Sequence, residues 1–182
     1  MTRRKKNEWG FSMGLDYGFM GRNERVSYFL ENYHELTREE LNKELPDIWI
    51  DCEFPGIVSR YEDWVEIFLE AGFCSDDGTT KPTDPEEKIE LYRSAPSEYK
   101  YGMSWTSSYE TAKWFNERNH TIGNSDAKIY KTVVPKGLVL AVLNSRNECE
   151  FVIDPQDAKV YGVETIEYMS DKRKKSPNEC NR

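Results

Sequence analysis

Histidine, cysteine and long apolar runs are all scarce in this sequence of 182 residues. With only His34 and His120 present, catalysis that depends on a well-placed imidazole is disfavoured. The four cysteines are far apart and include no C-x-x-C pair, which argues against a metal centre and predicts reduced thiols. The longest apolar run, 137–143, is far shorter than the stretch of about 20 residues that a membrane helix needs, and no apolar leader follows the basic start. We therefore expect a cytoplasmic protein that has no membrane partner.

Basic residues are also in deficit, with 25 Lys and Arg against 33 Asp and Glu, and they concentrate at the two ends. Outside residues 3–8 and 171–182, 16 basic residues face 30 acidic ones. An acidic body repels nucleic-acid backbones, so a dedicated duplex-binding protein is disfavoured. The basic ends are either simply solvated or add weak, salt-sensitive attraction for an anionic partner. Hydrophobic residues make up 37% and aromatic residues 13%, which is enough for a packed core.

Helical patterns dominate residues 23–73, where apolar residues recur at a spacing of three and four. A capping box at 37–40 opens a second helix, which we expect to end before Pro46. A further capping box at 59–62 opens a third helix, with Gly72 as its C-terminal stop. The sequence therefore predicts a helical subdomain in this part of the chain.

The pattern changes to strands after residues 74–87, which hold turn formers and two prolines and are predicted to be a linker. Short β-branched and aromatic runs, cut by turn signals, then follow to about residue 170. The predicted strands are 88–93, 101–106, 129–134, 138–143, 150–153 and 159–169, and the predicted helix is 107–119. The chain thus divides into an irregular basic arm (1–22), a helical subdomain (23–73), a linker (74–87), a strand-rich core (88–170) and a basic tail (171–182).

Three short segments of the strand-rich core carry residues suited to chemistry. Tyr92-Arg93 ends the first predicted strand, Ser104-Trp105-Thr106 lies directly before the helix, and Glu148-Cys149-Glu150 lies where a turn enters a strand. Taken singly, each has an ordinary structural explanation: a surface ion pair, a helix cap, and two solvent-facing carboxylates. Their order, with the helix segment 112–115 (Ala-Lys-Trp-Phe) between the second and third, makes a more specific pattern.

This pattern resembles the Arg–Ser–Glu class of mono-ADP-ribosyltransferases, as found in compact bacterial toxins and phage-encoded host modifiers. The resemblance covers residues 87–170, and residues 1–86 show no match. Together with the helical pattern of residues 23–73, the resemblance implies an α+β fold. In this fold, a small, split, mostly antiparallel sheet follows the helical subdomain. It implies that residues 88–170 bind NAD as substrate, and that ADP-ribose passes to a macromolecular target with release of nicotinamide.

The resemblance gives the two glutamates different roles. The second, Glu150, would stabilise the oxocarbenium-like sugar as nicotinamide departs, a transition state similar in kind to that of glycoside cleavage. The first, Glu148, would orient or deprotonate an incoming guanidinium, which makes a protein arginine the favoured acceptor. Because alternate residues of a strand share a face, we expect both carboxylates to point into the same cleft.

Four more residues are expected to bind the cofactor. By resemblance, Arg93 would hold the phosphates of NAD or brace the ribose, since a guanidinium fork matches phosphate oxygens. The backbone of Ser94, where the family more often has glycine, would clamp the nicotinamide carboxamide. Ser104 would orient Glu150 through a hydrogen bond, and Thr106 would support the strand and the helix start. Arg93 and Ser104 are only 11 positions apart, which predicts a compact cleft with the adenosine end of NAD less enclosed.

The sequence leaves several alternatives open. An NAD glycohydrolase would use the same site with water as acceptor, and an inactive relative of the fold would act only as a binding module. RNA or DNA stays open as the acceptor beside protein arginine, because the two ends of the chain are basic. By resemblance to toxins, an antitoxin is a further partner to consider.

Overall fold

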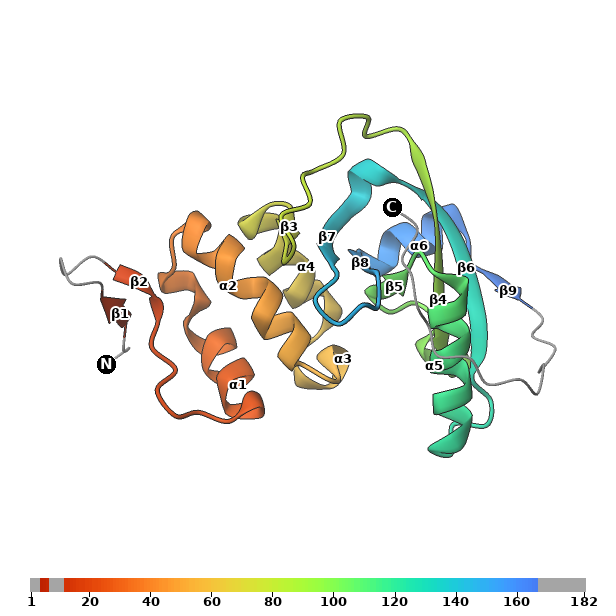
Figure 1. The fold of residues 1–182 in the computed structure, drawn as a ribbon, viewed down its shortest axis with the longest axis horizontal. Helices are drawn as coiled ribbons and strands as arrows, with labels where there is room; N and C mark the ends of the chain where they lie inside the picture. Colours follow the sequence, from red (N-terminus) through yellow and green to blue (C-terminus); the bar gives the residue numbers. More distant parts are fainter. Residues whose placement is uncertain (1–3, 7–11, 167–182) are drawn as a thin grey trace. The chain divides into compact units, whose positions relative to one another are not determined.

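The computed structural model describes residues 4–6 and 12–166 (Figure 1). Its backbone contacts divide the chain into two compact units, one ending at Cys74 and the other beginning at Ser75. Both helices and strands are present, so the structure belongs to the expected α+β class. The predicted basic tail, 171–182, lies outside the described residues. None of the helices in the described residues is both long and apolar enough to cross a membrane.

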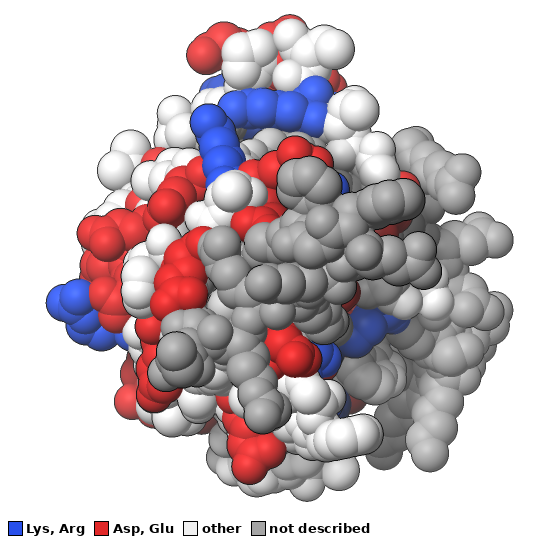
Figure 2. Space-filling view, turned by 90° about the vertical axis from the view of Figure 1, so that its left-hand side faces the viewer, with Lys and Arg blue, Asp and Glu red and all other residues white. Residues whose placement is uncertain are grey.

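The N-terminal unit is built mainly of helices. They are α1 (Arg22–Asn32), the short 3₁₀ helix η1 (Tyr33–Glu35), α2 (Arg38–Asp51), α3 (Pro55–Val58) and α4 (Tyr61–Ala71). Before them, β1 (Arg4–Lys6) and β2 (Ser12–Leu15) form a two-stranded antiparallel sheet, so the arm expected to be irregular contains two strands. Among the described residues on the face shown in Figure 2, acidic side chains outnumber basic ones, which fits the five basic against fourteen acidic residues between positions 12 and 74.

The helix α2 runs through Pro46 to Asp51, so the expectation that it ends before the proline is wrong. An internal proline costs a helix about 3 kcal/mol. Here the last turns carry Leu45, Ile48 and Trp49, which are all buried. Burying each such side chain contributes about 1.5–3 kcal/mol, and together they outweigh the proline. The helix α4 ends at Ala71, and Gly72 is its C-terminal stop as predicted, with a backbone φ of 79°.

The C-terminal unit is built on a sheet of seven strands in the order β3-β7-β8-β5-β4-β6-β9. The strands are β3 (Cys74–Ser75, at the division between the units), β4 (Lys88–Ala95), β5 (Ser104–Thr106), β6 (Lys128–Pro135), β7 (Val139–Leu143), β8 (Glu150–Ile153) and β9 (Glu164–Ile166). The five neighbouring pairs from β7 to β9 are antiparallel. The helix α5 (Tyr109–Thr121) packs on β4 (Figure 1).

A single strand was expected at 159–169, and this is wrong. Residues Pro155–Tyr161 form the helix α6, and only β9 follows as a strand within the described residues. Asp154 caps the helix, because its Oδ1 accepts a hydrogen bond of 2.8 Å from the backbone N–H of Gln156. Proline at the first helical position costs nothing, since that N–H has no partner within the helix.

Candidate functional site

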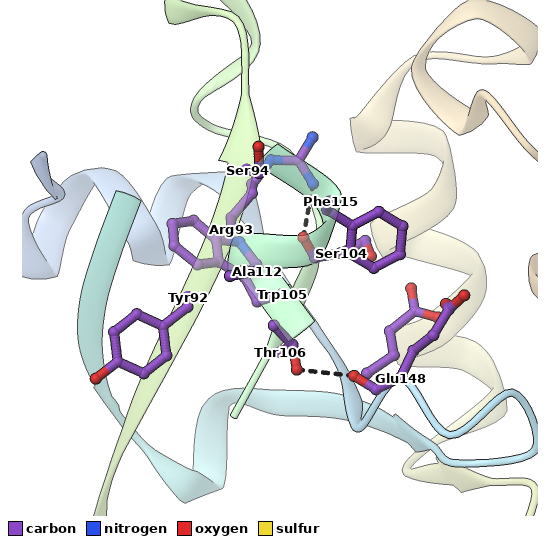
Figure 3. Close-up of a pocket in the computed structure, with 10 residues that line it drawn as sticks. Tyr92, Arg93, Ser94, Ser104, Trp105, Thr106, Ala112, Phe115 and Glu148 are labelled. Carbon is purple, nitrogen blue, oxygen red and sulfur yellow. Dashed lines mark hydrogen bonds between the residues drawn. The ribbon is translucent and has the colours of Figure 1, made fainter. Parts of the chain in front are cut away.

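One cavity of about 140 Å³ in the C-terminal unit is lined by all six predicted site residues. Figure 3 shows this cavity with its lining side chains. The predicted residues are Arg93, Ser94, Ser104, Thr106, Glu148 and Glu150. Tyr92, Trp105, Ala112 and Phe115 complete the lining. The three segments singled out in the sequence therefore meet in space, together with one face of α5.

The cavity arises where the sheet opens between β4 and β5. Strand β4 pairs with β6 along eight residues, but with β5 only at Tyr92 and Thr106. On its other side, Thr106 pairs with Glu150 of β8. Tyr92, Thr106 and Glu150 therefore form a row across three strands, with backbones about 4.8 Å apart from strand to strand. Arg93 follows Tyr92 just past the point at which β4 and β5 diverge.

The side chain of Arg93 braces the loop between β4 and β5. Its Nη1 donates a hydrogen bond of 2.6 Å to the carbonyl oxygen of Ser104 (Figure 3). Its Nε donates one of 3.3 Å to the carbonyl oxygen of Tyr99. The guanidinium lies against Gly102, where an added Cβ would fall 2.2 Å from Nη2. Glycine at this position thus lets the charged group lie against the backbone at the edge of the cavity.

The hydroxyls of the two predicted serines have different surroundings. Ser94 donates to Oδ1 of Asn116 and accepts from Nδ2 of Asn119, both at 3.1 Å, so its side chain ties β4 to α5. The hydroxyl of Ser104 has no hydrogen-bond partner among the described residues, so the expected bond from it to Glu150 is absent. Ser104 contributes its carbonyl to Arg93 and presents its side chain to the cavity.

The two glutamates differ in burial. Only 7% of the Glu150 side chain is exposed, against 27% of the Glu148 side chain. Arg146 lies beside both, with Nη2 at 3.4 Å from Oε2 of Glu148 and 3.9 Å from Oε2 of Glu150. Burial raises the pKa of Glu148 and the charge of Glu150 raises it further, while Arg146 and Arg118 lower it. Glu148 therefore holds its proton more readily than an ordinary glutamate.

The loop that carries Glu148 has an unusual backbone. Asn147 and Cys149 both adopt left-handed conformations, with φ of 55° and 48°, which cost L-residues about 1–2 kcal/mol each. The surrounding structure holds this loop: the hydroxyl of Thr106 donates a hydrogen bond of 2.7 Å to the carbonyl of Glu148 (Figure 3). Strand alternation does not extend to Glu148, because β8 begins at Glu150. Both carboxylates nevertheless line the cavity.

Cys149 lies between the two glutamates and is disulfide-bonded. The expectation that all four thiols are reduced is therefore wrong for this residue, while Cys52 and Cys74 are free and buried. Spacing along the chain could not reveal the bond, because a disulfide depends on how closely two cysteines approach in space. In the part of the chain that the structure describes, no group of three or more His, Cys, Asp or Glu residues could hold a metal ion.

Asp76 anchors the same loop, and the sequence analysis did not find it. Its Oδ1 accepts the backbone N–H of Asn144 and its Oδ2 that of Ser145, both at 2.8 Å. The neighbouring Asp77 accepts a hydrogen bond of 2.7 Å from the side-chain amide of Asn144. A carboxylate followed by turn formers indicates only a local turn. The backbone partners of Asp76 are instead 68 and 69 positions away in the sequence.

Replacing Asp76 by alanine is expected to loosen the loop ahead of Glu148. Two backbone donors would lose charged acceptors, which destabilises the unit by about 1–3 kcal/mol. Hydrogen exchange at the amides of Asn144 and Ser145 should become faster, as NMR can measure residue by residue. Asp84→Ala is the matched control, because within residues 12–166 the carboxylate of Asp84 accepts only the nearby N–H of Glu86. Equal exchange rates at the two amides in both variants would show that Asp76 does not hold the loop.

No family model, no curated protein and no solved structure matches the chain. The case for a function therefore rests on the geometry of the cavity and on the residues that line it.

Proposed function

We propose that the chain is an NAD-dependent mono-ADP-ribosyltransferase that moves ADP-ribose to a macromolecular target and releases nicotinamide. Protein arginine is the favoured acceptor, with RNA or DNA as alternatives. One observation carries the proposal: Arg93, Ser104 and the pair Glu148 and Glu150 come from three separate segments and line a single cavity. The ordinary explanations of these residues were a surface ion pair, a helix cap and solvent-facing carboxylates. None of these roles requires the three segments to line one cavity.

The position of Glu150 suits the chemistry of nicotinamide loss. Breaking the bond between ribose C1′ and the nicotinamide nitrogen leaves positive charge on the sugar, while the neutral base takes the electron pair. A fixed carboxylate at the edge of a poorly hydrated cavity stabilises that charge without reorganising. Glu150 is buried and begins β8 in register with Thr106, so its backbone is fixed by the sheet.

The size of the cavity fits one end of the dinucleotide. Pockets that enclose a drug-sized ligand measure about 300–1,000 Å³, and this one is smaller. It has room for the nicotinamide group, which would leave the ribose at its mouth, the phosphates near Arg93 and the adenosine end outside. The opening between β4 and β5 supports the proposal that the sheet is the split sheet of the ADP-ribosyltransferase fold.

The incubation of the purified protein with labelled NAD, alone and with a bacterial lysate, tests the proposal. We expect label on a macromolecule, and protease against nuclease treatment then tells protein from nucleic acid. Rapid release of nicotinamide without any labelled macromolecule would replace the transferase by an NAD glycohydrolase. A protein that neither releases nicotinamide nor is stabilised by NAD would be a binding module instead.

The close contact between Arg93 and Gly102 leads to a prediction for NAD affinity. In Gly102→Ala, the added methyl would lie 2.2 Å from Nη2, so the guanidinium must move. Losing one charged hydrogen-bonding group from the site should weaken NAD binding about tenfold, as calorimetry can measure. Gly21→Ala is the control, because its methyl would lie 3.8 Å from Oε2 of Glu24, an ordinary contact distance. If both variants bind NAD as the unaltered protein does, Arg93 has no part in binding.

A further inference from the structure

Arg146 lies beside the two glutamates that line the cavity. Its Nη2 is 3.4 Å from Glu148 and 3.9 Å from Glu150, the two carboxylates at the cavity. The side chain is 44% exposed, so the guanidinium is not locked into the core. It is carried by the loop whose backbone is held by Asp76 on one side and by Thr106 on the other. These hydrogen bonds of the loop therefore fix the position from which the guanidinium of Arg146 reaches the two glutamates.

We propose that Arg146 is an acceptor of the protein's own reaction, so that the chain ADP-ribosylates itself at this residue. The inference rests on the proposed function, because it needs NAD cleavage at the same cavity. The inference adds the residue that is modified. It also gives the acceptor, a guanidinium of the chain itself, so that no external target is needed.

The reaction balances with groups that are already in place. The bond between C1′ of the ribose and the nicotinamide nitrogen breaks, and neutral nicotinamide leaves with the electron pair. A terminal nitrogen of Arg146 forms a new bond to C1′, and the proton that it loses passes to the carboxylate of Glu148. The distance of 3.4 Å between these two groups is close to that of a hydrogen bond. NAD is the only co-reactant.

The alternative acceptor is Arg118 of α5, whose charge also acts on Glu148. Arg146 forms ion pairs with both glutamates, at 3.4 Å and 3.9 Å. Because the acceptor belongs to the same chain, the step is intramolecular. Its rate constant should not depend on protein concentration. ADP-ribose attached to Arg146 would also lie at the cavity and hinder a second NAD, so labelling should stop at one group per chain.

Mass spectrometry of the purified full chain after incubation with NAD tests the inference. We expect one ADP-ribose per chain, mapped by peptide sequencing to Arg146, and a labelling rate unchanged on dilution. Arg146→Lys keeps the positive charge but lacks the guanidinium, so label should fall by about tenfold or more. Arg60→Lys, at an exposed arginine of the N-terminal unit, is the matched control and should be labelled normally.

The outcomes separate this inference from the proposed function. Label on lysate targets with none on Arg146, or label on Arg118 in its place, would overturn the inference and leave the transferase standing. Full labelling of Arg146→Lys would likewise overturn it. An absence of nicotinamide release both with and without lysate would overturn the proposed function and the inference together.

Discussion

Nicotinamide release is expected to fall by about two to three orders of magnitude when Glu150 is replaced by glutamine. The variant keeps the size and most of the hydrogen-bonding capacity of the side chain but removes its charge. A neutral amide cannot stabilise the positive charge that develops on the ribose, whereas the loss of NAD affinity in the ground state should be small. Release of labelled nicotinamide in a single-turnover assay measures the effect directly.

Two controls accompany the Glu150→Gln variant. Glu164→Gln removes a carboxylate from the exposed strand β9, which is outside the cavity, and should leave release unchanged. Thermal unfolding of both variants shows whether the fold is intact, since Glu150 is buried next to Arg146. A folded Glu150→Gln protein that releases nicotinamide at the normal rate would remove Glu150 from the chemistry.

Local patterns predicted most of the elements that surround the cavity. The alternation at 88–93, the Ser-x-Thr before a helix and the run that begins at Glu150 correspond to β4, β5, α5 and β8 in the structure. Each of these signals depends on neighbouring residues alone, which is why one sequence suffices to read them. The order of the three segments along the chain then predicted which side chains would share a cavity.

Tertiary effects account for the features that the sequence did not reveal. The helix α2 continues through Pro46 because its far end is buried, and burial cannot be read from the proline itself. The pair Asp154-Pro155 was interpreted only as the end of a strand, but it also starts the helix α6. Asp154 caps this helix and Pro155 is its first residue. Asp76 supports the loop through partners that are distant in sequence, which no local pattern can reveal.

Replacing Glu148 by glutamine should separate transfer from cleavage. A general base contributes about 10²–10⁴-fold, so transfer to an arginine target should fall by that factor. Hydrolysis of NAD should suffer much less, because water needs no guanidinium-binding carboxylate. Parallel assays of target labelling and of nicotinamide release measure the two rates. An equal loss of target labelling and of nicotinamide release would show that Glu148 acts on the ribose of NAD rather than on the acceptor.

The pH dependence of Glu148 gives the same assignment an independent test. Its pKa is raised above 4.5, first by burial and then by Glu150, against the opposing charges of Arg146 and Arg118. Transfer by the unaltered protein should therefore decline as the pH falls through this raised pKa, because the protonated carboxyl cannot accept a proton. That decline should be missing from the residual activity of Glu148→Gln.

Stability should change with pH in the opposite direction. A carboxyl whose pKa is higher in the folded than in the unfolded state stabilises the fold below the unfolded value, and this contribution is lost as the pH rises through the folded pKa. Glu148→Gln stays neutral throughout. Its melting temperature should therefore rise relative to that of the unaltered protein between pH 4 and neutrality, by scanning calorimetry. A relative fall over the same range would mean that Arg146 and Arg118 outweigh burial, and that Glu148 is an ion-pair partner instead of a base.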